Sequence, residues 1–331
     1  MKKAAFYTLG CKVNQYETEA MAELFADSGY EIKEFTEVAD VYVINTCSVT
    51  NMGDRKSRQI IRRAKKLNPN AVIAVTGWYA QTAPDEVLAI EGVNLVLGTT
   101  DRKNIVTLVE ELNTESNINH VSDIMSNHEF EELQIKQYSN RTRAFIKIQE
   151  GCNQFCSYCI IPYARGPVRS RAKDDVVREI KELAHNGFKE IILVGIHVAS
   201  YGVDLGDTTL ESLIMDVDKI DGVERIRLSS IEPMTLNQEF IDSIKDSKKL
   251  CHHFHISLQS GCDETLKRMN RKYTTAQFKG IVDGLREAFD DVAITTDIMV
   301  GFPDESDEEF NKTVEFVRNI KNSGNPGRAV V

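Results

Sequence analysis

Short apolar segments alternate with amphipathic segments along the first third of the chain. Residues 4–9, 41–46, 71–76 and 95–97 are apolar or β-branched runs, which predict buried strands. Residues 17–27, 54–67, 84–89 and 102–112 have the composition and apolar spacing of helices. Strands that are apolar on both faces are typical of a parallel sheet covered by helices on both sides. This part of the chain therefore predicts an open parallel α/β sheet with flanking helices.

The alternation resumes at residue 141 and continues almost to the end of the chain. Strands are predicted at residues 144–149, 190–196, 225–230, 253–258 and 293–300, and helices at 174–185, 210–219, 236–244, 275–289 and 307–320. This order predicts a partial β/α barrel, in which functional side chains belong at the carboxyl ends of the strands. Gly324, Pro326 and Gly327 interrupt the last residues, so we expect no sixth strand and a barrel truncated at the C-terminus.

Residues 113–140 lack this alternation and are rich in Asn, Ser, Glu and Gln, which predicts a linker. The expected organisation is an N-terminal domain at 1–112, a linker at 113–140 and a barrel domain at 141–331.

Composition adds a constraint on charge. The 331 residues include 42% hydrophobic and 27% charged side chains, as in ordinary globular proteins. The net charge of −10 means that RNA or another polyanion would need a local basic patch. No apolar run reaches the roughly 18 residues of a membrane span, and the N-terminus lacks a signal-peptide pattern. We therefore expect a cytoplasmic protein with no membrane partner.

Three of the seven cysteines, Cys152, Cys156 and Cys159, lie within one eight-residue segment just after a predicted strand. Such crowding favours a metal or redox site over disulfides. Three thiolates can hold a [4Fe–4S] cluster and leave one iron free for a small molecule. A zinc site is the alternative, but it would need a fourth ligand, and none lies at standard spacing.

Cys11 and Cys47 each follow a predicted strand of the N-terminal sheet. Ligands of open parallel sheets bind at this edge, outside the carboxyl ends of the strands. A single cysteine is by default a buried packing residue, but two thiols at equivalent strand ends favour a functional role at this edge.

Basic side chains gather in two places. On a helix, Arg55, Arg58, Arg62 and Lys65 form one stripe opposite an apolar one, which predicts an RNA-binding surface or an ordinary solvated face. Arg165, Arg169 and Arg171 follow the three-cysteine segment, and we expect Arg169 and Arg171 to contact RNA.

The three-cysteine segment resembles the defining motif of the radical S-adenosylmethionine (SAM) superfamily. The resemblance implies that the open iron binds SAM, which is cleaved after one-electron reduction to give a 5′-deoxyadenosyl radical. It also implies SAM contacts by an aromatic residue beside the last cysteine, for which ordinary packing is the alternative, and by residues at later strand ends. In this sequence these are Tyr158, Gly195, Ser229, Gln259, Ser260 and Gly301.

Within that superfamily, the chain resembles the methylthiotransferases. The matching motifs include Leu-Gly-Cys-Lys-Val-Asn-Gln-Tyr-Glu at residues 9–17 and His-Ile-Ser-Leu-Gln-Ser-Gly-Cys at residues 255–262. The first is most similar to the branch that modifies N6-threonylcarbamoyladenosine in tRNA. The implied function is the addition of a methylthio group to C2 of that adenosine beside the anticodon. A ribosomal-protein aspartate methylthiotransferase is the alternative within the family.

The resemblance also implies a second [4Fe–4S] cluster on three N-terminal cysteines, and an electron donor such as flavodoxin or ferredoxin. Cys11 and Cys47 match two of these cysteines, but Trp78 occupies the third position. An indole N–H is only a donor and cannot ligate iron. The resemblance also implies a small C-terminal RNA-binding barrel, which we do not expect within these 331 residues. A tRNA-binding protein impaired in catalysis is therefore a further alternative.

Overall fold

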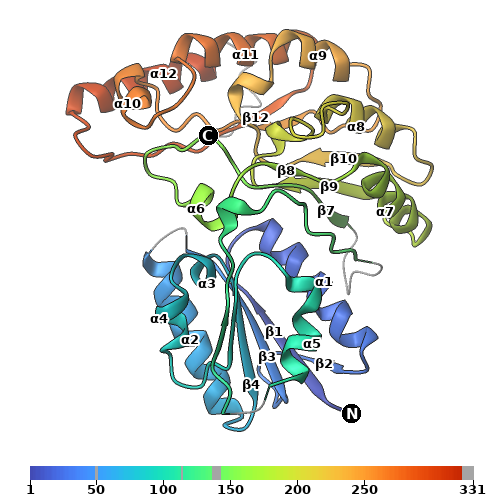
Figure 1. The fold of residues 1–331 in the computed structure, drawn as a ribbon. Helices are drawn as coiled ribbons and strands as arrows, with labels where there is room; N and C mark the ends of the chain where they lie inside the picture. The colour runs from blue at the N-terminus through green and yellow to red at the C-terminus, as the bar shows by residue number, and fades with distance from the viewer. Residues whose placement is uncertain (49–50, 113–114, 136–142, 323–331) are drawn as a thin grey trace. The chain divides into compact units, whose positions relative to one another are not determined.

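The computed structural model describes residues 1–48, 51–112, 115–135 and 143–322 (Figure 1). Contacts divide the chain into two compact units. Unit 1 comprises Met1–Ser139, Glu150–Asn153 and Ile160–Arg169, and the remaining described residues form unit 2.

Within the described residues, unit 1 has a sheet of six parallel strands in the order β2-β1-β3-β4-β5-β6. They are β1 (Lys3–Thr8), β2 (Glu31–Lys33), β3 (Val41–Thr46), β4 (Val72–Gly77), β5 (Leu95–Leu97) and β6 (Ile118–His120). β1 pairs with β3, so the connections leave this pair in opposite directions. In open α/β sheets, ligands bind at such a switch point, beyond the carboxyl ends of the strands.

Helices cover both faces of this sheet, as the sequence predicts (Figure 1). α1 (Lys12–Asp27) and α5 (Ile105–Glu110) pack on one face, against Val41 and Val43 of β3. α2 (Asn51–Leu67), α3 (Trp78–Thr82) and α4 (Pro84–Leu88) pack on the other, against Tyr42 and Ile44. Successive residues of β3 thus face opposite helix layers, which explains its unbroken apolar sequence.

The segment predicted as a linker, residues 113–140, contains a short strand. Ile118–His120 forms β6, which pairs with β5 from Leu95 to Leu97. All three β6 residues are exposed. A three-residue edge strand of this kind has no apolar pattern for sequence analysis to detect. Residues 136–140 of the predicted linker lie outside the described part of the chain.

The predicted boundary at residue 141 also differs from the observed division. The chain returns to unit 1 twice after entering unit 2, at Glu150–Asn153 and at Ile160–Arg169, which contains the short helix α6 (Ile161–Arg165). The two units are therefore not consecutive segments of the sequence.

Unit 2 contains the predicted partial barrel. Its described strands β7 (Arg143–Glu150), β8 (Arg169–Ser170), β9 (Glu190–Gly195) and β10 (Arg225–Leu228) form one sheet in the order β10-β9-β7-β8. β11 (His253–His255) pairs in parallel with β12 (Ala293–Thr295), and bridges at Ile226–Leu250 and Ile231–Ile256 link β10 to the β11 segment. Strands β7, β9, β10, β11 and β12 thus follow one another in chain order, with a helix before each of β9 to β12, and β8 lies at the other edge of β7.

The helices of unit 2 lie close to their predicted positions. They are α7 (Lys173–His185), α8 (Leu210–Asp218), α9 (Gln238–Ile244), α11 (Thr275–Ala288) and α12 (Asp307–Asn322), and a short helix not predicted from the sequence, α10 (Asp263–Arg268). The predicted break at Gly324, Pro326 and Gly327 lies outside the described residues. No helix in the described part of the chain is both long and apolar enough to cross a membrane.

Candidate functional site

The three-cysteine segment follows β7 directly, as predicted. Cys152 is buried, and Cys156 and Cys159 are half-buried. Cys152 N donates a hydrogen bond to Gly166 O at 3.1 Å, and Cys159 N donates to Cys156 O at 3.0 Å. Backbone hydrogen bonds thus hold the segment that carries the three thiols.

Residues 155–157 are held against the chain that follows α10. Asn270 Nδ2 donates to Phe155 O at 2.8 Å, and Ser157 N donates to Met269 O at 3.1 Å. Ser157 Oγ also donates to Arg268 O at 2.9 Å. These three hydrogen bonds join positions more than a hundred residues apart and fix the backbone on both sides of Cys156. Nothing in the local sequence pattern predicts this contact.

Arg271 lies at the end of this contact, and sequence analysis did not identify it. Its Nη1 lies 3.3 Å from Cys156 Sγ, and its Nη2 lies 2.7 and 2.6 Å from the two carboxylate oxygens of Glu232. The guanidinium also lies over the Tyr273 ring, 5.0 Å from its centroid. Burial alone disfavours its charge, but Glu232 and neighbouring groups raise the pKa of Arg271 above its ordinary value. A permanent cation therefore faces one thiol of the segment.

The structure brings several predicted SAM contacts together at adjacent strand ends. Ser229, just after β10, donates from its backbone N to Leu193 O of β9 at 3.1 Å, close to Gly195. Gln259 bridges to Ile298, three residues before Gly301. These positions therefore line up along the carboxyl edge of the barrel strands, as the sequence predicts.

Tyr158 also lies near this edge. Its ring packs edge-on against Phe302, with 6.2 Å between the ring centroids, and Phe302 follows the predicted contact Gly301. Partial burial raises the pKa of Tyr158 to about 12. The packing alternative and the adenine contact are both compatible with this position.

Two polar atoms at the same strand ends have no hydrogen-bond partner among the described residues. They are Ser229 Oγ and His197 Nε2, and both are buried. His197 was not predicted; its Nδ1 lies 2.7 Å from Ser200 Oγ, and its Nε2 lies 3.9 Å from Glu232. Burial and the nearby Arg271 cation lower the pKa of His197 to about 4, so the ring is neutral at pH 7. Buried polar atoms without partners indicate a place for a polar ligand.

Ser260 was predicted to contact SAM, and in the structure its hydroxyl has partners within the protein. Its side chain is fully buried. The hydroxyl accepts a hydrogen bond from Cys262 N at 3.2 Å and lies 3.1 Å from Thr313 Oγ1. Ser260 therefore holds its own loop, as a buried hydroxyl must find partners within the protein.

The donor set fits an iron–sulfur cluster better than zinc. In the described residues, no three His, Cys, Asp or Glu side chains converge on a point where one metal ion could bind. Zinc needs its ligands within about 2.3 Å of a single ion, whereas a cubane distributes its thiolates over several irons. Three thiols with an Arg271 donor and the orphaned polar atoms of His197 and Ser229 therefore suit a [4Fe–4S] cluster with SAM on its open iron.

Cys11 and Cys47 lie at neighbouring strand ends of unit 1, as predicted. Cys11 precedes α1 and is exposed, and Cys47 follows β3 and is buried. A Cβ on Gly10 would lie 3.0 Å from Cys47 Sγ, so this thiol packs against the backbone beside Cys11. Both cysteines flank the switch point between β1 and β3.

Trp78 lies at the end of the next strand. Gly77 pairs with Thr46 and has a φ of 96°, and any side chain there would meet Thr46 O at 2.4 Å. This close approach places residue 78 beside the end of β3, which Cys47 follows. The Trp78 indole is 3% exposed, its Nε1 has no partner among the described residues, and Arg165 lies 5.4 Å above its ring. Two thiols and an indole do not fit a cluster that needs three thiolates.

Arg169 and Arg171 do not form the predicted RNA-binding group. Both side chains are buried. Arg171 is paired with Glu179, and Arg169 donates to Asn127 O at 3.1 Å and to Arg165 O at 2.8 Å. In this structure, neither guanidinium is exposed for contact with a phosphate group.

Arg165 belongs to a buried charge network inside unit 1. It contacts Glu17 at 2.6 Å and Glu150 at 2.5 Å, and donates to Asn14 Oδ1 at 2.8 Å. Arg102 pairs with Glu17 at 2.6 Å and with Glu131 at 2.7 Å. This network forms part of the core of unit 1, not a cationic opening.

The same network extends to the N-terminal thiols through Asn14. Asn14 Nδ2 donates to Leu9 O at 2.8 Å and to Thr46 O at 3.0 Å, on the segments that lead to Cys11 and Cys47. Asn14 thereby ties both cysteine-bearing strand ends to Arg165.

The basic side chains that are exposed on α2 are not the four of the predicted stripe. Arg58 Nη1 donates to Tyr79 OH at 2.9 Å, and Lys65 Nζ donates to Pro69 O at 2.7 Å, so two of the four predicted cations are used within unit 1. Arg55 and Arg62 are exposed, as are three further basic side chains of the helix: Lys56, Arg63 and Lys66. These five exposed side chains, which we call the α2 basic face, are the available cations.

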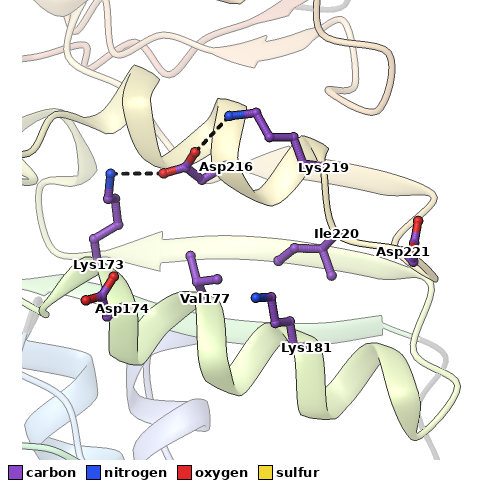
Figure 2. A pocket seen from close by; sticks show the side chains of 8 residues that line it. All are labelled: Lys173, Asp174, Val177, Lys181, Asp216, Lys219, Ile220 and Asp221. Carbon is purple, nitrogen blue, oxygen red and sulfur yellow. Dashed lines mark hydrogen bonds and ion pairs between the residues drawn. The ribbon is translucent and has the colours of Figure 1, made fainter.

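Two pockets show which of these side chains border open space. An open pocket of about 640 Å³ in unit 1 is lined by Gly10, Cys47, Arg55 and Lys56 among others, so the α2 basic face begins beside a predicted cluster cysteine. A second pocket of about 500 Å³ lies between α7 and α8 (Figure 2). There Asp216 pairs with Lys173 at 2.9 Å and Lys219 at 3.0 Å, and none of the predicted site residues lines it.

Comparison with known proteins supports both units. Residues 146–317 match the radical SAM superfamily, and residues 3–98 match the uncharacterized protein family UPF0004. The threonylcarbamoyladenosine tRNA methylthiotransferase MtaB of Bacillus subtilis is 49% identical over 97% of this chain and 72% of its own length. The protein of the same name from Aquifex aeolicus is 42% identical over 96% of this chain and 78% of its own.

Solved structures show the same fold. The radical SAM methyltransferase TsrM from Kitasatospora setae aligns over 97% of this chain and 72% of its own, with a TM-score of 0.69 and 15% identity. The cobalamin-dependent radical SAM enzyme OxsB aligns over 96% of this chain and 52% of its own, with a TM-score of 0.62. The sequence matches show more than the fold, since they combine this coverage with 49% and 42% identity. The chain therefore belongs to the radical SAM superfamily and, within it, to the methylthiotransferase family.

Proposed function

We propose that this protein adds a methylthio group to C2 of N6-threonylcarbamoyladenosine in tRNA. The observation that carries the proposal is its similarity, across both units, to relatives named for that activity. A ribosomal-protein substrate has less support, because the relatives compared are named as tRNA-modifying enzymes.

In this proposal, Cys152, Cys156 and Cys159 hold a [4Fe–4S] cluster. With SAM bound, that cluster supplies one-electron chemistry able to remove a hydrogen atom from an adenine carbon. The protein's own contribution is to position SAM. Ser229 Oγ and His197 Nε2 offer buried polar atoms without other partners, and Tyr158 lies beside the Gly301 segment at the edge predicted for the adenine.

The tRNA would bind through the α2 basic face, whose exposed cations begin at the pocket beside Cys47. Phosphate contacts of this kind provide affinity without reading sequence. The electron would come from a low-potential carrier such as a flavodoxin or ferredoxin. A tRNA substrate places the proposed activity in the cytoplasm.

The test is to incubate the anaerobically reduced protein with SAM and tRNA containing N6-threonylcarbamoyladenosine, and to analyse the digested nucleosides by mass spectrometry. The 2-methylthio derivative is the expected product. A tRNA with isopentenyladenosine and a ribosomal protein serve as competing substrates. Product on either of these alone would refute the proposed substrate.

A second candidate function rests on Trp78. Because Trp78 removes one of the three thiols expected on unit 1, the chain could bind tRNA and cleave SAM without transferring sulfur. Formation of 5′-deoxyadenosine with no methylthiolated nucleoside would favour this candidate over the first.

A further inference from the structure

Arg271 is a charged side chain that contacts one thiol of the three-cysteine segment, that of Cys156. Its Nη1 lies 3.3 Å from Cys156 Sγ, a distance suited to an N–H···S hydrogen bond. Sequence analysis gave no role to Arg271, which lies 115 residues from Cys156.

The position of this guanidinium is fixed from three sides. Glu232 accepts from Nη2 at 2.7 and 2.6 Å, and Nε lies 3.2 Å from Tyr273 OH. Tyr273 OH in turn donates to Ser257 O at 2.7 Å. The side chain of Arg271 is 7% exposed and that of Glu232 is 10% exposed, so water screens the pair little.

The backbone adds a further constraint. The hydrogen bonds from Asn270 to Phe155 and from Ser157 to Met269 tie the residues on both sides of Cys156 to those just before Arg271. The backbones that carry the thiol and the guanidinium are therefore held together within unit 2, and the contacts with Glu232 and Tyr273 orient the guanidinium.

We propose that Arg271 is a positioning residue that raises the reduction potential of the cluster through its hydrogen bond to Cys156. Reduction adds one electron from a low-potential carrier protein to the cluster and breaks no bond. A fixed cation and an N–H donor at a ligand sulfur stabilise the added negative charge. Glu232 holds the guanidinium and partly offsets its charge, so the pair sets the potential. The proposal rests on the barrel cluster of the proposed function and is independent of the tRNA substrate.

The experiment is a potentiometric titration of the reconstituted cluster, without SAM, followed by electron paramagnetic resonance. All variants carry Cys11→Ala and Cys47→Ala, so that only the barrel cluster contributes to the signal. Arg271→Met together with Glu232→Gln removes both buried charges and leaves neither unpaired. At a fixed solution potential, we expect its ratio of reduced to oxidised cluster to fall about tenfold, which corresponds to about 59 mV for one electron. Arg271→Lys retains the charge and should recover part of this loss.

Arg268→Met is the matched control. Arg268 lies three residues earlier and pairs with Glu309 at 2.8 and 2.9 Å, and its substitution should leave the potential unchanged. Iron content equal to that of the unmodified protein shows that the variants still load the cluster. An unchanged reduction potential in a double variant that still holds its cluster would overturn the inference. If SAM binding were weakened at the same time, Arg271 would contribute to SAM binding and not to the potential. Absence of a cluster from the unmodified protein would overturn both this inference and the proposed function.

Discussion

A single side chain, Trp78, determines how many thiols the carboxyl edge of the unit 1 sheet presents. Cys11, Cys47 and Trp78 follow β1, β3 and β4, which are adjacent strands. The indole fills the third position and packs beneath the buried Arg165 cation. The chemistry of this edge therefore depends on residue 78 more than on the fold.

Replacing Trp78 with Cys should restore a third thiol. The unmodified chain is expected to hold about four iron atoms, one barrel cluster, and Trp78→Cys about eight. Iron and sulfide analysis after anaerobic reconstitution measures the difference. Trp78→Ala is the control, since it removes the indole without adding a ligand and should leave the iron content unchanged. Eight irons in the unmodified chain would mean that another ligand replaces the missing thiol.

The barrel cysteines should be indispensable for SAM cleavage. Replacing Cys152, Cys156 or Cys159 with Ala removes one of three thiolates and should reduce 5′-deoxyadenosine formation to background. Chromatography of the products after dithionite reduction measures it. Cys251→Ala, outside the segment, is the matched control and should cleave SAM normally. Continued cleavage by the triple variant would show that the cluster is held elsewhere.

His197 should make the protein less stable in acid. Its pKa is about 4 in the folded protein and about 6.5 when unfolded, so between these values the unfolded chain binds a proton that the folded chain does not. The free energy of unfolding should therefore fall by about 3 kcal/mol as the pH drops through this window. His197→Asn should remove this component. Chemical denaturation at several pH values, with the exposed His185→Asn as control, tests the difference.

At the scale of elements, α2 shows what periodicity can and cannot predict. Its apolar positions predicted the helix and its buried side correctly, since Ile60 and Ala64 are buried. The spacing also grouped Arg58 and Lys65 with the solvent-facing cations, although Tyr79 and Pro69 O partner them. Tyr79 lies in the helix after the next strand, and Pro69 lies in the turn that follows α2. Neither partner belongs to the sequence of α2, so the spacing within α2 could not reveal them.

Neutralising the α2 basic face should weaken tRNA binding. We expect conversion of Arg55, Lys56, Arg62 and Lys66 to Gln to lower affinity and to reduce the salt dependence of binding by about one unit per lost phosphate contact. Filter binding at several salt concentrations measures both. The control converts four exposed lysines of the barrel helices and their connections to Gln, which changes the net charge equally: Lys181, Lys189, Lys219 and Lys279. Equal losses in the two variants would show only a general charge effect.

At the scale of the whole molecule, the sequence predicted which strands and helices form better than it predicted which residues meet. Local periodicity, which can be read from each segment alone, predicts the parallel sheet and the partial barrel. It also predicts the strand-end positions of Cys11, Cys47 and Ser229. The contact of Arg271 with Cys156 and the burial of Arg169 and Arg171 depend on partners distant in the chain. Charged residues were the main source of error, because an isolated sequence does not distinguish a solvated arginine from a buried, paired one.

The buried charge network has a consequence for how this protein can be divided. Glu17 lies in the first helix, yet its partner Arg165 comes from a segment encoded after the three-cysteine motif. A fragment ending at residue 139 would keep the Arg102–Glu17 and Arg102–Glu131 pairs but would lose Arg165, which contacts Glu17 at 2.6 Å and is fully buried. Gene fusions that exchange the N-terminal sheet between relatives would therefore have to carry the segment through residue 169 with it. The part of the chain that makes unit 1 complete is therefore longer than the part that forms its sheet.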